Sequence, residues 1–196
     1  MISASEHPYV ETDRRFKLFG SNVRVLIGPP ARAGLPSPEA MGIQIEFFLR
    51  LLHRKLTRFD EGSELSALNS EPGESCSVSP TLAAAVNAAL WAARRSRGLV
   101  DPTLVAELEE VGYATSRADL RAESITAALA VAPDRAPAAA RADSRWNGVA
   151  VDVVAGVVTR PPGVRIDTGG CGKGLAADLA AERLSGYSSF VVDAGG

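Results

Sequence analysis

The most constraining feature of this 196-residue chain is a glycine-rich segment near its C-terminal end, Arg165 to Asp178. An apolar stretch ends at Asp167, four glycines then surround Lys173, and an alanine-rich stretch follows. This pattern predicts a strand over Val164–Asp167, a glycine turn, and a helix over Leu175–Leu184. Glycine lets backbone approach a ligand closely, and N–H groups at a helix start favour an anion. The segment therefore suits a phosphate or pyrophosphate, although glycine turns also serve as plain strand–helix connections.

The common phosphate-binding motifs do not match this segment. A P-loop requires Gly, four residues, Gly-Lys, and then Ser or Thr. Counting back from Gly172-Lys173 places Asp167 at the first position, and Gly174 follows the lysine. The dinucleotide pattern GxGxxG also fails, because Ala177 stands where its third glycine belongs. These failures disfavour a nucleotide-dependent kinase or NTPase.

The composition is that of a globular protein, with 46% hydrophobic and 22% charged residues and a net charge of -2. Such a charge offers no basic surface for nucleic acid. The cysteines, Cys76 and Cys171, and the histidines, His7 and His53, form neither a disulfide framework nor a metal-ligand pattern. No secretory signal and no membrane-length apolar run is found. We therefore expect a cytoplasmic protein without a membrane span.

Hydrophobic periodicity predicts a mixture of helices and strands. A polar tail is expected over residues 1–15, followed by a domain over 16–196. Ser37 and Ser79 are predicted to cap the first two long helices, and Ser63–Asn69 to form a short one. The predicted helices are Pro38–Thr57, Thr81–Ser96, Leu104–Glu110 and Asp119–Ala130, and the predicted strands are Phe16–Ile27, Trp146–Val151, Gly156–Arg160 and Ser188–Asp193.

Four segments in order resemble the ApbE-like flavin transferases, the FAD:protein FMN transferases. A weaker match to the family's next strand and Gly-Gly follows at Val191–Gly196. The four segments are Phe19-Gly20-Ser21, Phe59-Asp60-Glu61-Gly62-Ser63-Glu64-Leu65-Ser66-Ala67-Leu68-Asn69, Gly98-Leu99-Val100-Asp101-Pro102-Thr103, and Asp167 to Asp178.

The resemblance implies an α+β fold of the T-fold-like type that holds FAD in a cleft. It also implies a reaction in which Mg²⁺ helps to break the FAD pyrophosphate and AMP leaves. FMN is then joined to a Thr or Ser hydroxyl of an acceptor protein. A cation that bridges phosphate oxygens, supported by a lysine, suits this chemistry because it neutralises developing charge.

Carried over position by position, the resemblance assigns Asp167 and Lys173 to catalysis and to FAD contact. Gly170 would offer its carbonyl to Mg²⁺. Phe59 is also consistent with a core aromatic, and Asp101 with a turn residue. Ser63, Ser66 and Asn69 are expected to stabilise their local turn. The remaining FAD contacts implied by the resemblance are Phe19, Phe59, Leu99, Val100 and Asp101.

The chain departs from the family pattern at Phe19, Val100, Gly172 and Leu175, where the family usually has Met, Phe, Ala and an aromatic residue. The family's other Mg²⁺ ligands, an Asp and a Thr, belong to a later segment. We therefore expect the N-terminal portion of one flavin transferase domain, truncated after Gly196 and inactive or unstable alone. Two alternatives stay open: an FAD-binding or FAD pyrophosphatase protein of the same fold, and an inactive truncated paralogue.

Overall fold

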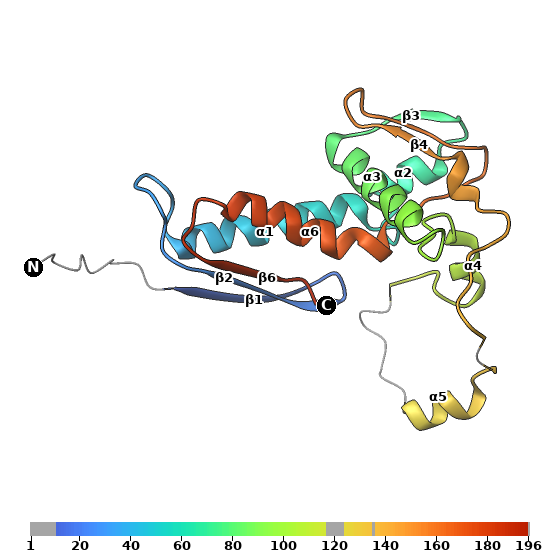
Figure 1. Ribbon diagram of the computed structural model, residues 1–196, viewed down its shortest axis with the longest axis horizontal. Coiled ribbons are helices and arrows are strands. Elements are labelled where there is room, and N and C mark those ends of the chain that lie inside the picture. The colour runs from blue at the N-terminus through green and yellow to red at the C-terminus, as the bar shows by residue number, and fades with distance from the viewer. Residues whose placement is uncertain (1–10, 117–123, 135, 196) are drawn as a thin grey trace, which may run out of the picture.

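The computed structural model describes residues 11–116, 124–134 and 136–195. Figure 1 shows an elongated molecule with a long sheet-and-helix part at one end and a smaller mixed part at the other. Both sheets are antiparallel and helices pack against them. This arrangement confirms the predicted α+β class.

The first sheet contains β1 (Thr12–Leu18), β2 (Ser21–Ile27) and β6 (Phe190–Asp193) in the order β1-β2-β6. The predicted single strand over 16–27 is wrong, because Phe19 and Gly20 turn the chain into a hairpin with φ values of 55° and 67°. Two consecutive residues at positive φ match the twist of paired strands, which is why such turns join hairpins. β1 also begins at Thr12, inside the predicted polar tail.

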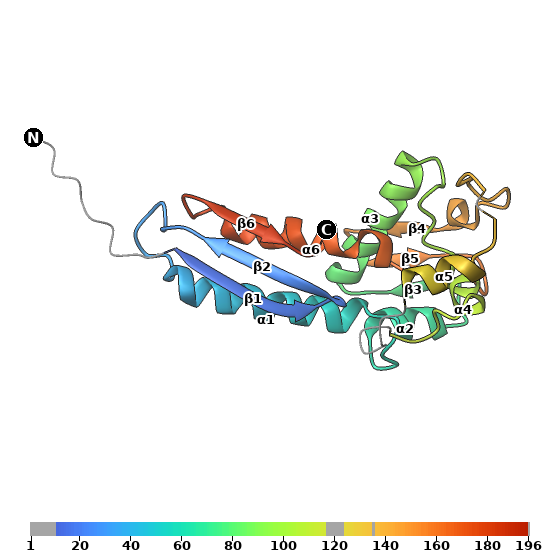
Figure 2. The ribbon, with the colours of Figure 1, turned by 90° about the horizontal axis from the view of Figure 1, so that it is seen from below.

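Helices α1 (Pro38–Leu56) and α6 (Gly169–Leu184) cover one face of this sheet, as Figures 1 and 2 both show. Ser37 caps α1 as predicted, since its side chain accepts the Ala40 N–H. Apolar residues of the helices and of β2 interlock in the first core cluster. Its fully buried members include Val23, Val25, Ile27, Ile45, Leu49, Ala176, Ala180 and Leu184.

The second part is built on a small sheet with the order β3-β5-β4. Its strands are β3 (Ser75–Ser77), β4 (Ala150–Asp152) and β5 (Val157–Thr159). Helices α2 (Glu64–Ser70) and α3 (Pro80–Arg95) pack beside it, and Ser63 and Ser79 cap them. The second core cluster includes Leu65, Leu82, Val86, Leu90, Val158 and Ile166, and Leu56 of α1 packs against both clusters.

Three further elements are short: α4 (Val105–Glu110), α5 (Ile125–Val131) and a 3₁₀ helix, η1 (Arg145–Gly148). The predicted helix over 119–130 is thus limited to α5 within the described residues, and residues 119–123 lie outside them. Of the predicted strand over 146–151, residues 146–148 belong to η1 and residues 150–151 to β4. The predicted strand over 164–167 has no strand partner in the described chain. Among residues 11–116, 124–134 and 136–195, no helix is both long enough and apolar enough to cross a membrane.

Candidate functional site

The glycine-rich segment forms the first turns of α6, and the prediction of a loop before a helix at Leu175 is wrong. α6 begins at Gly169 with Thr168 as its N-cap residue, and the Thr168 carbonyl accepts the N–H of Gly172 at 2.7 Å. Glycine disfavours helix in isolation, so the surrounding structure overrides local propensity here. Gly172 and Gly174 leave space open: a Cβ at either would meet no atom of the described structure within 4 Å. The start of α6 therefore presents bare backbone with room beside it.

Asp167 lies immediately before this helix, and its carboxylate is firmly held. One oxygen accepts the Gly169 N–H at 2.7 Å, and the other accepts from Arg58 Nε at 2.9 Å. The backbone N–H of Asp167 donates to the Pro102 carbonyl at 2.8 Å. The helix dipole also favours a negative charge at this end. Both the backbone and the carboxylate of Asp167 are therefore oriented by contacts within the fold.

Arg58 joins Asp167 to an aromatic pair. Its side chain is only 5% exposed. The guanidinium carbon lies 4.3 Å from the ring centroid of Phe59 and 4.7 Å from that of Tyr113, and Arg58 also donates to the Tyr113 carbonyl. The two rings meet at 63° with centroids 5.3 Å apart. Phe59 is 36% exposed, so its ring is partly fixed by Arg58 and partly open.

Lys173 lies one turn further along α6 and reaches a different part of the fold. Its Nζ donates to Ser21 Oγ at 2.6 Å, and the Gly195 carbonyl oxygen lies 3.5 Å from the same nitrogen. Gly195 has a φ of 82°, and a Cβ there would lie 2.4 Å from the Ser21 Cβ. Only glycine fits between these segments. Lys173 thus connects the first hairpin, α6 and the segment after β6.

The segment after α3 lies beside the start of α6. Val100 is the nearest side chain to Gly170, at 3.8 Å from a Cβ built there. Asp101 accepts hydrogen bonds from the Thr103 N–H at 2.8 Å and from the Thr103 hydroxyl at 2.5 Å. These bonds are typical of a local turn, and a turn residue is the alternative role predicted for Asp101 from the sequence. Leu99 and Val100 are 59% and 37% exposed, which leaves apolar surface next to the helix start.

Phe19 is less directly connected to this cluster. It lies in the β1–β2 turn with its ring edge-on to His53, at a centroid distance of 5.3 Å. Phe19 lies two residues before Ser21, whose Oγ accepts a hydrogen bond from Lys173 Nζ. The structure therefore brings Asp167, Gly170, Val100, Lys173 and Phe59 around one helix start, with Leu99 and Asp101 adjacent to Val100 in sequence and Phe19 at the margin.

The described residues do not fit a magnesium site by themselves. Gly170 lies in the first turn of α6, where carbonyl groups bond to N–H groups four residues on. Among residues 11–116, 124–134 and 136–195, no three His, Cys, Asp or Glu side chains are grouped as metal ligands. Mg²⁺ requires near-octahedral oxygen coordination, usually with at least one carboxylate. One helical carbonyl does not meet that need, so these residues alone would not hold the metal.

Cys171 lies between Asp167 and Lys173 in the chain but does not offer a nucleophile. Its thiol donates weakly to the Thr168 carbonyl, with a sulfur–oxygen distance of 3.4 Å. Burial, assisted by the negative charge of Asp167, raises the pKa of the Cys171 thiol to about 11. A thiol of that pKa is almost entirely protonated at neutral pH.

Three residues at this site were missed or misjudged from the sequence: Arg58, Asn69 and Ser21. Asn69 does not stabilise its local turn, because its amide bonds to the backbone of Ile166. Ser63 does act locally, through a bond from the Ser66 N–H. Arg58 directly precedes the motif that begins at Phe59, but no local sequence pattern predicts that this arginine is buried.

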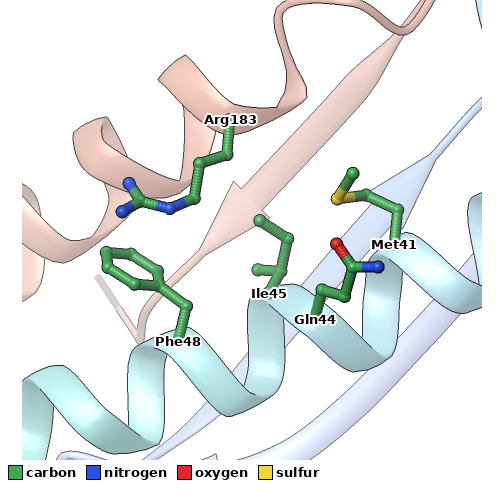
Figure 3. A pocket seen from close by; sticks show the side chains of 5 residues that line it. All are labelled: Met41, Gln44, Ile45, Phe48 and Arg183. Atoms are coloured by element: carbon green, nitrogen blue, oxygen red, sulfur yellow. The ribbon is translucent and has the colours of Figure 1, made fainter. Parts of the chain in front are cut away.

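A hollow of about 350 Å³ lies elsewhere, between α1 and the C-terminal end of α6 (Figure 3). Figure 3 shows Arg183 reaching from α6 toward Phe48 of α1, and its guanidinium carbon lies 3.5 Å from the Phe48 ring centroid. Met41, Gln44 and Ile45 complete the lining. None of the predicted site residues contributes to this lining.

Known proteins of one family are similar to this chain. The model of the ApbE family matches residues 19–196. An FAD:protein FMN transferase of Rhodobacter capsulatus is 30% identical over 195 residues, which cover 96% of this chain and 34% of that protein. This chain therefore spans about a third of the length of that curated relative.

Solved structures show a similar fold. The ApbE protein of Thermotoga maritima has a TM-score of 0.65 at 25% identity, covering 88% of this chain and 52% of that one. The apo form of the flavinyl transferase ApbE of Pseudomonas stutzeri has a TM-score of 0.71 at 21% identity, covering 94% and 58%. The chain thus spans somewhat more than half the length of these structures.

Proposed function

Because the chain belongs to the ApbE family, we propose that it carries the FAD-binding part of an FAD:protein FMN transferase. In the proposed reaction, the oxygen of a Thr or Ser hydroxyl on an acceptor protein bonds to the FMN phosphorus. The bond from that phosphorus to the oxygen bridging it to AMP breaks, AMP leaves with the bond's electron pair, and the hydroxyl proton passes to solvent. Residues 16–196 are proposed as one portion of a single flavin transferase domain.

One observation carries this proposal: Asp167 and Lys173 flank the bare start of α6, with exposed apolar side chains beside it. Lys173 uses two contacts in the described structure, to Ser21 and to the Gly195 carbonyl, and an ammonium group has three donors. A further donor is therefore available to an anionic ligand. The start of α6 also carries the positive end of the helix dipole, which favours an anion such as a pyrophosphate there.

The other predicted residues would supply apolar contact. Phe59, Leu99 and Val100 are each more than a third exposed although they are large and apolar. A ring system that covers them would remove apolar surface from water, at about 25 cal/mol per Å². We propose that the flavin lies against these side chains, with Asp101 and Phe19 at the edges of the same surface. Asp167 and Lys173 would orient the phosphates rather than provide a covalent nucleophile.

Magnesium dependence is part of the proposal on the family resemblance alone. Gly170 is the residue assigned to the metal, and the described residues add no carboxylate cluster to it. Metal ligands from outside the described residues would therefore be required. Titration of FAD binding with MgCl₂ tests this point. We expect Mg²⁺ to strengthen FAD binding only in a protein that also contains those ligands.

The transfer reaction is tested by incubating the chain with FAD, MgCl₂ and a Thr-containing acceptor protein of a related flavin transferase. Flavin fluorescence that stays on the acceptor in a denaturing gel, together with released AMP, supports transfer. Free FMN and AMP without labelled acceptor indicate an FAD pyrophosphatase instead. Neither product, in a chain shown to be folded, contradicts catalysis by this part of the protein. Lys173→Ala is the matched variant that should lose whichever activity is seen.

A further inference from the structure

Two residues of the segment that precedes and forms α2 hold the Asp167 region from far away in the sequence. The first is Arg58, 109 positions before Asp167, which pairs with its carboxylate at 2.9 Å. The exposed fractions of the two side chains are 5% and 17%. The same guanidinium packs on Phe59. The buried Arg58 side chain therefore orients both the Asp167 carboxylate and the Phe59 ring, two groups that are proposed to contact FAD.

The second residue is Asn69, whose side-chain amide pairs with both backbone groups of Ile166. Its Nδ2 donates to the Ile166 carbonyl at 2.8 Å, and its Oδ1 accepts the Ile166 N–H at 2.7 Å. Residues 164–167 have no strand partner in the described structure. The amide of Asn69 therefore takes the place of a neighbouring strand and fixes the backbone next to Asp167.

Helix α2, which carries Asn69, is itself held at both ends. Ser63 caps its start, where its hydroxyl oxygen accepts the Ser66 N–H at 3.0 Å. At its end, buried Arg160 donates to the carbonyls of Leu68 and Glu71, both at 2.6 Å. Arg160 also donates to the Val164 carbonyl at 2.7 Å, so it ties α2 to the segment that leads to Asp167. Asn69 therefore acts from a rigid support.

We propose that Arg58 and Asn69 are positioning residues for FAD, which act through Asp167. Arg58 orients the carboxylate and the Phe59 ring, and Asn69 fixes the backbone from which the carboxylate extends. Groups held in place before the ligand arrives bind it more tightly, because less freedom is lost on binding. This inference rests on the proposed function and adds two residues to its site.

The test measures FAD dissociation constants by flavin fluorescence for the full chain and its variants. Arg58→Lys keeps the charge but loses the planar fork, and Asn69→Ala loses both bonds to Ile166. Each is expected to weaken FAD binding by about tenfold, as supporting residues around a site commonly do. Each is also made in an Asp167→Asn background. There the effect of Asn69→Ala should shrink to less than about twofold, because residues that act through one group are not additive, and the effect of Arg58→Lys should shrink to the part that acts through the Phe59 ring.

Ser63→Ala is the matched control, because it destabilises the same helix by about 1 kcal/mol without touching Ile166 or Asp167. It should leave FAD affinity unchanged at temperatures where all variants are folded. Three outcomes overturn the positioning role: variants that bind like wild type, equal losses in both backgrounds, or a Ser63→Ala loss equal to that of Asn69→Ala. A folded wild-type chain that binds no FAD overturns the proposed function itself, and this inference with it.

Discussion

The two sides of the α6 start are held in contrasting ways. On the Asp167 side, a carboxylate is paired with a buried arginine and with a backbone N–H. On the Lys173 side, the ammonium contacts one hydroxyl at 2.6 Å and one carbonyl at 3.5 Å. The first side is organised by folding, whereas the second keeps a donor available to a ligand. Substitutions on the Asp167 side should therefore lower the unfolding free energy strongly, whereas substitution of Lys173 should lower ligand affinity with little loss of stability.

The largest effect is expected from Arg58→Ala. Removing this side chain leaves the Asp167 carboxylate largely buried without its cation, which costs about 3 kcal/mol or more of unfolding free energy. Urea denaturation followed by circular dichroism measures the change. Arg50→Ala is the control, because the Arg50 side chain is 46% exposed and Glu46 keeps its pair with Arg14, so this i,i+4 pair is worth about 0.5 kcal/mol or less. Equal losses in the two variants would contradict a specially organised Asp167 side.

The reactivity of Cys171 should also report on the Asp167 side. With its pKa raised to about 11, the Cys171 thiol has a much smaller thiolate fraction than an ordinary thiol. In a Cys76→Ser background at pH 8, alkylation by iodoacetamide should be about tenfold slower or more than in urea.

Asp167→Asn should speed this alkylation, because it removes the negative charge that helps to raise the pKa. The rate is followed by mass spectrometry. A folded chain that reacts as fast as the unfolded one would contradict a buried thiol at the α6 start.

A smaller effect is expected from His53, which packs on the hairpin of the Lys173 side through Phe19. Burial, and then the nearby charge of Arg50, lower the pKa of His53. The unfolded chain therefore binds more protons as the pH falls through about 6.5, and the folded chain loses stability there. Stability above that pH is unaffected. His53→Gln should flatten the change in melting temperature between pH 7 and pH 5.5, and an unchanged slope would contradict the assignment to His53.

The smallest stability effect is expected from Lys173→Ala. Its ammonium is only half-buried and its contacts are polar, so the loss should stay within about 0.5 kcal/mol. The same urea titration detects this. A loss as large as that of Arg58→Ala would remove the contrast between the two sides and make Lys173 a structural residue.

Much of the fold follows from local patterns in the sequence. The N-caps at Ser37 and Ser79 and the periodic apolar residues of α1 and α3 predict those helices closely. The hairpin turn was missed, because Phe19 at positive φ is a conformation that only Gly, Asn and Asp commonly adopt. The early start of α6 was missed because four glycines predict a turn, whereas tertiary contacts around Thr168 and Asp167 impose a helix.

The site was predicted in part, for a physical reason. Asp167, Lys173 and the exposed apolar residues lie in short motifs that resemble those of the ApbE family, so the resemblance selects them, and their roles toward FAD stay a proposal. Arg58 and Asn69 act across 109 and 97 positions of the chain. Neither contact leaves a local signal, because a buried ion pair and a side chain that replaces a strand both depend on how distant segments meet.

FAD binding to this chain tests the central claim most directly. FAD fluorescence is titrated with the wild-type chain and with Asp167→Ala, Lys173→Ala and the double variant, each checked for folding by circular dichroism. The account predicts saturable binding by wild type, weaker binding by each single variant, and loss in the double variant. Equal binding by wild type and the double variant would contradict a flavin site at the start of α6.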